Sequence, residues 1–177
     1  MCGIVGAISN RNVDGILVEG LRRLEYRGYD SAGLAVIAKN NIERLRRAGK
    51  VMRLQEALES RKLEGQVGIS HTRWATHGVP SEKNAHPHIS DPDFAIVHNG
   101  IIENYLQIKD KLLDQGYTFS SDTDTEVVIH RIHSHFDKQK NLLESFRETI
   151  KELEGAFALA LICAHEPDKI IVARSGC

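Results

Sequence analysis

Cys2 directly follows the initiator methionine, and this placement could make one residue a complete nucleophilic unit. Cysteine is small enough for Met1 to be removed, which would leave a thiol and a free α-amine on the same residue. The α-amine has an ordinary pKa of about 7.7–8.0 and the thiol one of about 8.5, so the amine can accept the thiol proton without a histidine. The alternative is a buried structural cysteine, because cysteine is among the most buried residue types.

Three glycine-containing segments carry groups that could serve such a nucleophile. Residues 27–33 form a loop with charged residues inside it. Residues 71–78 follow a predicted strand and present a guanidinium, an indole and a hydroxyl before a glycine, which is typical of a binding loop. Residues 98–104 end another predicted strand with the side-chain amide of Asn99 beside the Gly100 N–H. Two such donors could stabilise a developing oxyanion.

These segments together resemble the N-terminal nucleophile glutamine amidotransferases, and within them the glutaminase domains of glucosamine-6-phosphate synthases. The resemblance covers nearly the whole chain and rests on residues 2–6, 27–33, 71–78, 99–104 and 121–126. Purine-pathway amidotransferases are the nearest alternative. Residues 29–31, Trp74 and residues 101–104 resemble the amino-sugar enzymes more than those enzymes or asparagine synthetase.

The resemblance implies a catalytic role for three residues. Cys2 would attack the side-chain amide of L-glutamine and form a γ-glutamyl thioester, with its own α-amine as the base. The side-chain amide of Asn99 and the backbone N–H of Gly100 would form the oxyanion hole. No metal or other cofactor is expected.

The resemblance also implies how free glutamine would be recognised. Arg73 would hold the α-carboxylate, helped by Thr76 and His77, while Asp124 and the Gly100 carbonyl would accept from the α-ammonium. Trp74 begins a segment, residues 74–78, that resembles the family's mobile lid, and Arg27 belongs to the loop beside Cys2. Without the resemblance, Arg73 and Asp124 would be interpreted as exposed surface charges, and Trp74 as a core aromatic.

Composition excludes some other classes of protein. The 23 Lys and Arg residues balance the 24 Asp and Glu residues, so no net field favours nucleic acid or an anionic membrane, and no apolar run is long enough to span a bilayer. Three cysteines without disulfide or zinc spacing favour the cytoplasm. Five clustered histidines, His71, His77, His86, His88 and His98, allow a zinc site as a minor alternative, although they lack zincin spacing. The remaining clusters, residues 44–53 and the helix histidines 130–135, indicate solvated or interface surfaces.

The periodicity of apolar residues predicts an α+β fold. Strands are expected at residues 4–9, 34–38, 42–46, 66–72, 94–98, 156–164 and 169–174, and helices at residues 13–26, 51–58, 105–116, 128–136 and 143–153. Strands gathered towards both ends of the chain favour layered sheets covered by helices. The resemblance specifies a four-layer αββα sandwich of the N-terminal nucleophile hydrolase type, without its C-terminal part.

Residues 1–177 are expected to form one glutamine amidotransferase type 2 domain that is truncated relative to the family. Family enzymes continue with two sugar-isomerase domains that bind fructose 6-phosphate and receive the ammonia. A non-catalytic fragment that acts only through interactions is therefore an alternative to an active glutaminase. The exposed apolar edge at residues 170–173 would favour association, so an oligomer is compatible with the sequence.

Overall fold

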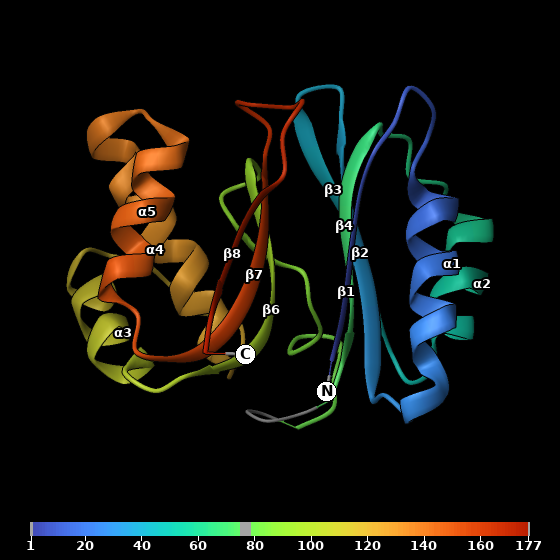
Figure 1. Ribbon diagram of the computed structural model, residues 1–177, viewed down its shortest axis with the longest axis horizontal. Helices are drawn as coiled ribbons and strands as arrows, with labels where there is room; N and C mark the ends of the chain where they lie inside the picture. Colours follow the sequence, from blue (N-terminus) through green and yellow to red (C-terminus); the bar gives the residue numbers. More distant parts are fainter. Residues whose placement is uncertain (1, 75–78, 177) are drawn as a thin grey trace.

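The computed structural model describes residues 2–74 and 79–176, apart from the side chain of Arg27, and shows two antiparallel sheets packed face to face between two layers of helices (Figure 1). The strand order of the first sheet is β1 (Gly3–Ile8), β4 (Val67–Arg73), β2 (Ser31–Ala38) and β3 (Asn41–Ala48). The strand order of the second sheet is β5 (His88–Ser90), β6 (Phe94–Ile102), β7 (Gly155–Cys163) and β8 (Ile171–Ser175). The α+β prediction and the four-layer arrangement are confirmed.

Five α-helices form the outer layers, and their apolar faces explain where they pack. Helices α1 (Asp14–Leu24) and α2 (Val51–Ser60) cover the first sheet, while α3 (Tyr105–Asp114), α4 (Asp124–Gln139) and α5 (Leu142–Glu152) cover the second (Figure 1). The side chain of Asn141 accepts a hydrogen bond from the Glu144 N–H and so caps the start of α5. The short 3₁₀ turn Glu25–Arg27 ends at Gly28, whose φ of 73° is the left-handed conformation that glycine favours.

Three apolar clusters correspond to the three spaces between the layers. The clusters between helices and sheets contain large side chains such as Leu17 and Leu34 in the first and Phe94 and Phe157 in the second. The space between the two sheets is filled largely by alanine, valine and isoleucine side chains, namely Ala35, Ile37, Ile42, Val67, Ile69, Ala95, Val97, Ala160, Ile162 and Ala164. Small side chains at this position let the two sheets approach closely.

Several elements differ from the sequence predictions. β2 begins at Ser31 instead of residue 34, and α4 begins at Asp124 instead of residue 128. β6 continues beyond His98 to Ile102, because β7 pairs with it along its whole length, with Asn99 opposite Ala158 and Gly100 opposite Phe157. The short strand β5 was not predicted. The turn between β2 and β3 is centred on Lys39 and Asn40, and these residues have positive φ angles of 48° and 71°.

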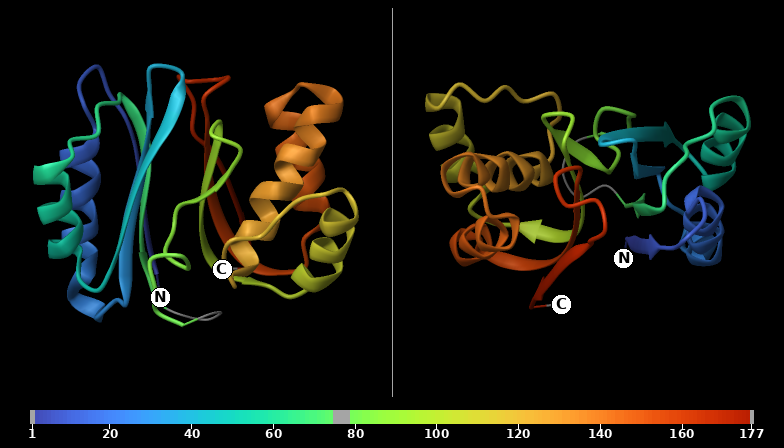
Figure 2. Two further views of the ribbon diagram at one scale, coloured as in Figure 1. Left: turned by 180° about the vertical axis from the view of Figure 1, so that it is seen from behind. Right: turned by 90° about the horizontal axis from the view of Figure 1, so that it is seen from above.

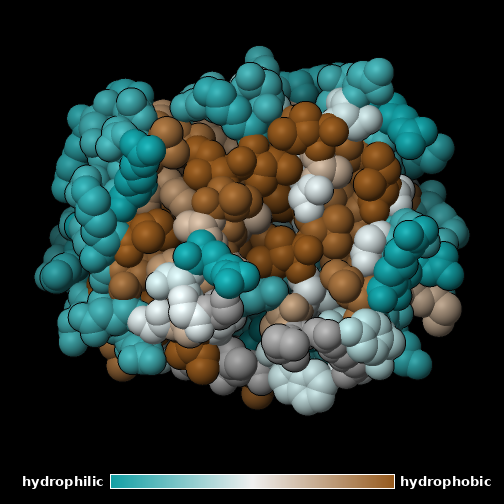
Figure 3. Space-filling model, viewed as in Figure 1, coloured by the Kyte–Doolittle hydropathy of each residue, from teal (hydrophilic) through white to brown (hydrophobic). Residues whose placement is uncertain are grey.

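The two sheets leave open edges on the same side of the sandwich. β1 and β8 are edge strands, and both lie on the face shown in Figure 1 and at the lower side of the right-hand view of Figure 2. A broad apolar area occupies the middle of this face (Figure 3). Each edge strand has an exposed apolar residue: Ile8 in β1 is 58% exposed, and Val172 in β8 is 68% exposed. The prediction of an exposed apolar edge near residues 170–173 is therefore confirmed for Val172, whereas its neighbours are half-buried.

One surface prediction was wrong and another holds only in part. His130 is buried and His133 and His135 are partly buried, because α4 packs these side chains against β5 and α5. In the basic cluster of residues 44–53, Lys50 and Arg53 are exposed as predicted, whereas Arg44 donates to the Pro87 carbonyl and Arg46 to the Ala85 carbonyl. Among the described residues, no helix is long and apolar enough to cross a membrane.

Candidate active site

The candidate site lies where β1, β4, β6 and the first turn of α4 meet. Gly3 pairs with Thr72, so the start of β1 places Cys2 beside the end of β4. A narrow pocket there is lined by residues from both sheets, including Cys2, Arg73, Trp74, Gly100 and Asp124. The structure therefore brings these five predicted residues together, although they come from segments far apart in the sequence.

The Cys2 thiol is half-buried beside Trp74. The Trp74 backbone N–H donates a hydrogen bond to Sγ at 3.1 Å. Burial raises the pKa of the Cys2 thiol, while the Trp74 hydrogen bond and the positive charge of Arg73 act in the opposite direction. Because the pKa stays above its ordinary value, the thiol needs a nearby base before it can act as a nucleophile at neutral pH.

Asn99 is bonded directly to the backbone of Cys2. Its Nδ2 donates to the Cys2 carbonyl at 2.9 Å, and its Oδ1 lies 2.8 Å from Nε2 of His71. A carbonyl only accepts, so Nδ2 must face Cys2, Oδ1 must face His71, and His71 Nε2 must carry the proton. The second N–H of the Asn99 amide is not used by the bond to Cys2. The orientation of Asn99 is thus fixed from both sides.

His71 is a functional candidate that the sequence analysis placed only within a motif. Its side chain is buried, which lowers its pKa to about 3, although the hydrogen bond with Asn99 acts in the opposite direction. The imidazole is therefore neutral near pH 7 and can hold Asn99 by a single N–H. His71 lies two residues before Arg73 in β4, and residues two apart share one face of a strand. From the sequence, this spacing could have indicated that His71 lies on the same face of the strand as Arg73.

Gly100 meets a conformational and a steric requirement at once. Its φ is +124°, and a Cβ built there would lie 2.0 Å from the Ala156 carbonyl oxygen. Only glycine satisfies both conditions. The backbone of β6 can therefore run past β7 and still line the pocket.

Opposite charges from β4 and from the first turn of α4 line the same pocket. Arg73 is 4% exposed, and its Nη1 lies 3.7 Å from Oδ1 of Asp30, a contact that the sequence analysis did not predict. Asp124 is 3% exposed, and its Oδ2 accepts a hydrogen bond from the Ile102 N–H at 2.9 Å. A buried guanidinium and a buried carboxylate in one pocket suit a ligand that carries both a carboxylate and a cationic group.

The rim of the pocket is described only in part. Trp74 is 52% exposed and lies next to Cys2, so it is not a core aromatic. Thr76 and His77, which were predicted to bind substrate, lie outside the described residues, as does the side chain of Arg27.

The four clustered histidines that the structure describes, His71, His86, His88 and His98, are engaged in hydrogen bonds inside the molecule. His98 Nδ1 lies 2.9 Å and His86 Nε2 lies 3.2 Å from the hydroxyl of Thr125, and His88 Nε2 lies 3.0 Å from the hydroxyl of Thr123. Within residues 2–74 and 79–176, no group of three or more His, Cys, Asp or Glu side chains has the arrangement of a metal site.

Comparison with known proteins agrees with this geometry. The family model described as a glutamine amidotransferase domain matches residues 71–176. The chain belongs to this family. The matched residues include His71, Arg73, Asn99, Gly100 and Asp124 of the candidate site.

Two curated relatives of this glutamine amidotransferase domain carry the same name. The glutamine–fructose-6-phosphate aminotransferase (isomerizing) of Shewanella oneidensis is 56% identical over 99% of this chain, and the enzyme of the same name from Pseudomonas putida is 55% identical over 99%. The chain spans only 29% of the length of each relative. The match therefore concerns one part of those enzymes.

A solved structure supports the fold independently. The glutamine phosphoribosylpyrophosphate amidotransferase from B. subtilis, complexed with ADP and GMP, superimposes with a TM-score of 0.82 at 26% identity. The superposition covers 99% of this chain and 37% of that enzyme. The αββα fold is accordingly that of the N-terminal nucleophile glutamine amidotransferases.

Proposed function

We propose that this chain hydrolyses L-glutamine to glutamate and ammonia, with Cys2 as the nucleophile and Asn99 and Gly100 as the oxyanion hole. The observation that carries the proposal is the fixed Asn99 side chain, which donates to the Cys2 carbonyl while His71 holds its other end. A preorganised donor of this kind stabilises negative charge without reorganising during the reaction.

The reaction begins once Met1 has been removed. The free α-amine of Cys2 takes the thiol proton, and the thiolate attacks the side-chain carbonyl carbon of glutamine. The tetrahedral oxyanion forms beside the second Asn99 N–H and the Gly100 N–H. When it collapses, the C–N bond breaks, the amide nitrogen leaves as ammonia with the proton returned by the α-ammonium, and a γ-glutamyl thioester remains. Water attacks the thioester by the same path and releases glutamate.

Recognition of free glutamine would use the two buried charges. Arg73 binds the α-carboxylate, with Thr76 and His77 contributing, and Asp124 accepts from the α-ammonium together with the Gly100 carbonyl. A free amino acid offers a carboxylate and an ammonium that match these two charges, so glutamine would be favoured over analogues that lack one of the two groups. Trp74 and the residues up to 78 would cover bound substrate, and Arg27 would belong to the loop beside Cys2.

We further propose that residues 1–177 are one type 2 glutamine amidotransferase domain that supplies ammonia for glucosamine 6-phosphate synthesis from fructose 6-phosphate. The 55–56% identity to aminotransferases of that name supports this acceptor. The structural likeness at 26% identity supports a purine-pathway amidotransferase as second candidate. A longer protein that contains this chain should form amino sugar from fructose 6-phosphate, and turnover of phosphoribosyl pyrophosphate instead would favour the second candidate.

A cytoplasmic role in amino-sugar synthesis fits the same proposal. The nucleophile must remain a reduced thiol, and reducing compartments preserve free cysteines. Cys2 and Cys163 are free cysteines in the described part of the chain.

Covalent labelling tests the proposed function directly. An electrophilic analogue of glutamine should add once, at Cys2, to protein whose intact mass lacks methionine. Cys163 is the internal control, because burial raises the pKa of its thiol to about 11 and it is fully buried. Labelling at Cys163 instead of Cys2, or no labelling of the processed protein, would contradict the assignment.

A further inference from the structure

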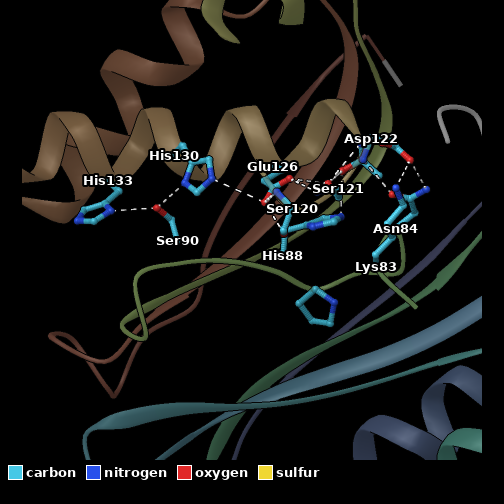
Figure 4. Close-up of polar contacts among 12 residues, drawn as sticks. Lys83, Asn84, His88, Ser90, Ser120, Ser121, Asp122, Glu126, His130 and His133 are labelled. Carbon is cyan, nitrogen blue, oxygen red and sulfur yellow. Dashed lines mark hydrogen bonds and ion pairs between the residues drawn. The ribbon is translucent and has the colours of Figure 1, made fainter. Parts of the chain in front are cut away.

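Glu126 is a buried carboxylate near the pocket that does not line it. It is 3% exposed and lies two residues after Asp124 in the first turn of α4. Its oxygens accept hydrogen bonds from the N–H and hydroxyl of Ser120 at 2.9 and 2.7 Å, and from the N–H and hydroxyl of Ser121, both at 2.7 Å (Figure 4). A carboxylate offers about four lone-pair sites, so the four donors of the loop before α4 can occupy all of them. His130 Nε2 lies 3.8 Å from Glu126 Oε1 on the helix side.

This arrangement differs from an ordinary helix cap. Thr123 is the N-cap of α4 and makes no side-chain capping bond, and Glu126 occupies the third helical position. In a capping box a glutamate at this position would reach back to the N–H of the N-cap residue. Glu126 reaches farther, to the N–H groups of Ser120 and Ser121. The carboxylate therefore closes the loop of residues 120–123 onto the helix.

The hydroxyl groups of the loop form a directed chain that ends on Glu126. Ser121 Oγ lies 2.7 Å from Glu126 Oε2, Thr123 Oγ1 lies 3.0 Å from Ser121 Oγ, and His88 Nε2 lies 3.0 Å from Thr123 Oγ1. Because the carboxylate only accepts, each hydroxyl donates toward it, and His88 Nε2 carries the proton that begins the chain. Aligned hydrogen bonds of this kind strengthen one another in a buried setting.

Asn84 holds the same loop from its other side. The Asp122 N–H donates to Asn84 Oδ1 at 2.9 Å, and Asn84 Nδ2 donates to Asp122 Oδ2 at 3.2 Å and to the Val79 carbonyl at 3.0 Å. Lys83 also pairs with Asp122 at 2.8 Å, as Figure 4 shows. The loop is thus anchored on both sides immediately before Asp124.

We propose that Glu126 is a positioning residue for substrate recognition, which holds the loop of residues 120–123 so that Asp124 faces the α-ammonium of glutamine. This inference rests on the proposed function. The Ile102 N–H fixes one oxygen of Asp124, but the backbone of Asp124 is placed by the loop and by the first turn of α4. Without the Glu126 carboxylate, the four donors of Ser120 and Ser121 would lose their acceptors and the loop would lose its closure.

The decisive experiment compares two ligands that differ only in the α-amino group. Dissociation constants of glutamate and of glutarate would be measured for the full chain, for Glu126→Gln and for Asp124→Asn. In Glu126→Gln the side-chain amide would face four donors with one acceptor oxygen. We expect Glu126→Gln to weaken glutamate binding on the order of tenfold, the equivalent of one lost charged hydrogen bond, and glutarate binding less than about twofold. Glu148→Gln, on exposed α5 surface, is the matched control and should change neither constant.

The outcomes separate this inference from the proposed function. If Asp124→Asn abolishes the preference for glutamate and Glu126→Gln keeps it, the positioning role is overturned while the recognition role of Asp124 stands. If Asp124→Asn keeps the preference, the ammonium site itself is wrong and the inference falls with it. Should Glu126→Gln fail to fold by circular dichroism, Ser121→Ala decides, because it removes one donor and breaks the chain from His88. A loss of preference smaller than that of Asp124→Asn supports the proposal, and an unchanged preference overturns it.

Discussion

The two sheets contribute to the candidate site in contrasting ways. The first sheet supplies Cys2 just before an edge strand, half-buried, with one backbone N–H at 3.1 Å from its sulfur. Helix α4, which covers the second sheet, supplies Asp124, which is 3% exposed, accepts a hydrogen bond from the Ile102 N–H of β6 and lies two residues before the hydrogen-bonded carboxylate of Glu126. The nucleophile side is lightly constrained and the recognition side is densely hydrogen-bonded. A sulfur that must form and break bonds needs fewer fixed contacts than a charge that must select its ligand.

Removal of the nucleophile is the strongest test of this contrast. Cys2→Ala should abolish glutamine hydrolysis, because no other group can form the thioester, and should leave the melting temperature nearly unchanged, because the side chain is only half-buried. Ammonia release and a thermal melt would measure the two effects. Cys163→Ala is the control and should retain hydrolysis, since Cys163 does not line the pocket. Equal hydrolysis by Cys2→Ala and the unmodified protein would contradict the assignment.

Blocking the α-amine tests the same side of the site without changing a side chain. A protein that retains Met1 or carries an N-terminal tag should be inactive, because the proposed base would be tied up in a peptide bond. Intact mass and ammonia release would be measured on the same sample. Removal of the extension by a protease should restore activity. A normal rate from the unprocessed protein would show that another group is the base.

Asn99, in the second sheet, hydrogen-bonds to the backbone of Cys2. Removal of its amide should therefore lower activity, although less than removal of Cys2. Asn99→Ala should lower kcat by about 10²–10³, or roughly 2.7–4 kcal/mol of transition-state stabilisation, with a smaller effect on glutamine binding. Steady-state kinetics over a range of glutamine concentrations would separate the two. An unchanged turnover number would remove Asn99 from the oxyanion hole.

Three buried histidines near the candidate site, His71, His86 and His88, should make the fold sensitive to mild acid. Burial lowers the pKa of His71 to about 3 and holds the pKa values of His86 and His88 well below their ordinary value. The unfolded chain therefore binds more protons, and the free energy of unfolding falls as the pH drops below about 6.5. Each histidine is expected to cost up to about 2 kcal/mol at pH 5 relative to pH 7. Urea unfolding at both pH values would measure this, and equal stabilities would show that these histidines protonate inside the fold.

The smallest effect is expected for His71, whose proposed role is to hold Asn99. His71→Phe keeps a ring but removes the donor to Asn99 Oδ1, so kcat should fall about fivefold, the equivalent of roughly 1 kcal/mol. His71→Gln retains an N–H donor and should recover part of the loss. The pH dependence should keep its shape in both variants, because a histidine with a pKa of about 3 does not titrate near neutral pH. A shifted profile would assign His71 a direct role in proton transfer.

Much of the fold could be predicted from local patterns, and the exceptions share a cause. The helices and most strands follow from apolar spacing and from stops such as Gly28. The extension of β6 through Asn99 and Gly100 did not, because it depends on pairing with β7, a strand far along the chain. The contact of Asp30 with Arg73 and the closure of the Ser120 loop by Glu126 were missed for a similar reason. These two contacts join polar groups, and such contacts leave no periodic pattern of apolar residues in the sequence.

The sequence by itself determined the elements and the chemical groups: a thiol that can become N-terminal, an amide beside a glycine, and one candidate binding charge of each sign. Tertiary structure alone decided that these groups share one pocket. Cys2 and Asn99 are 97 residues apart, and the hydrogen bond between them exists only because the two sheets pack face to face. Local periodicity reflects burial along one element, whereas the contact of two elements depends on the summed packing of all the layers.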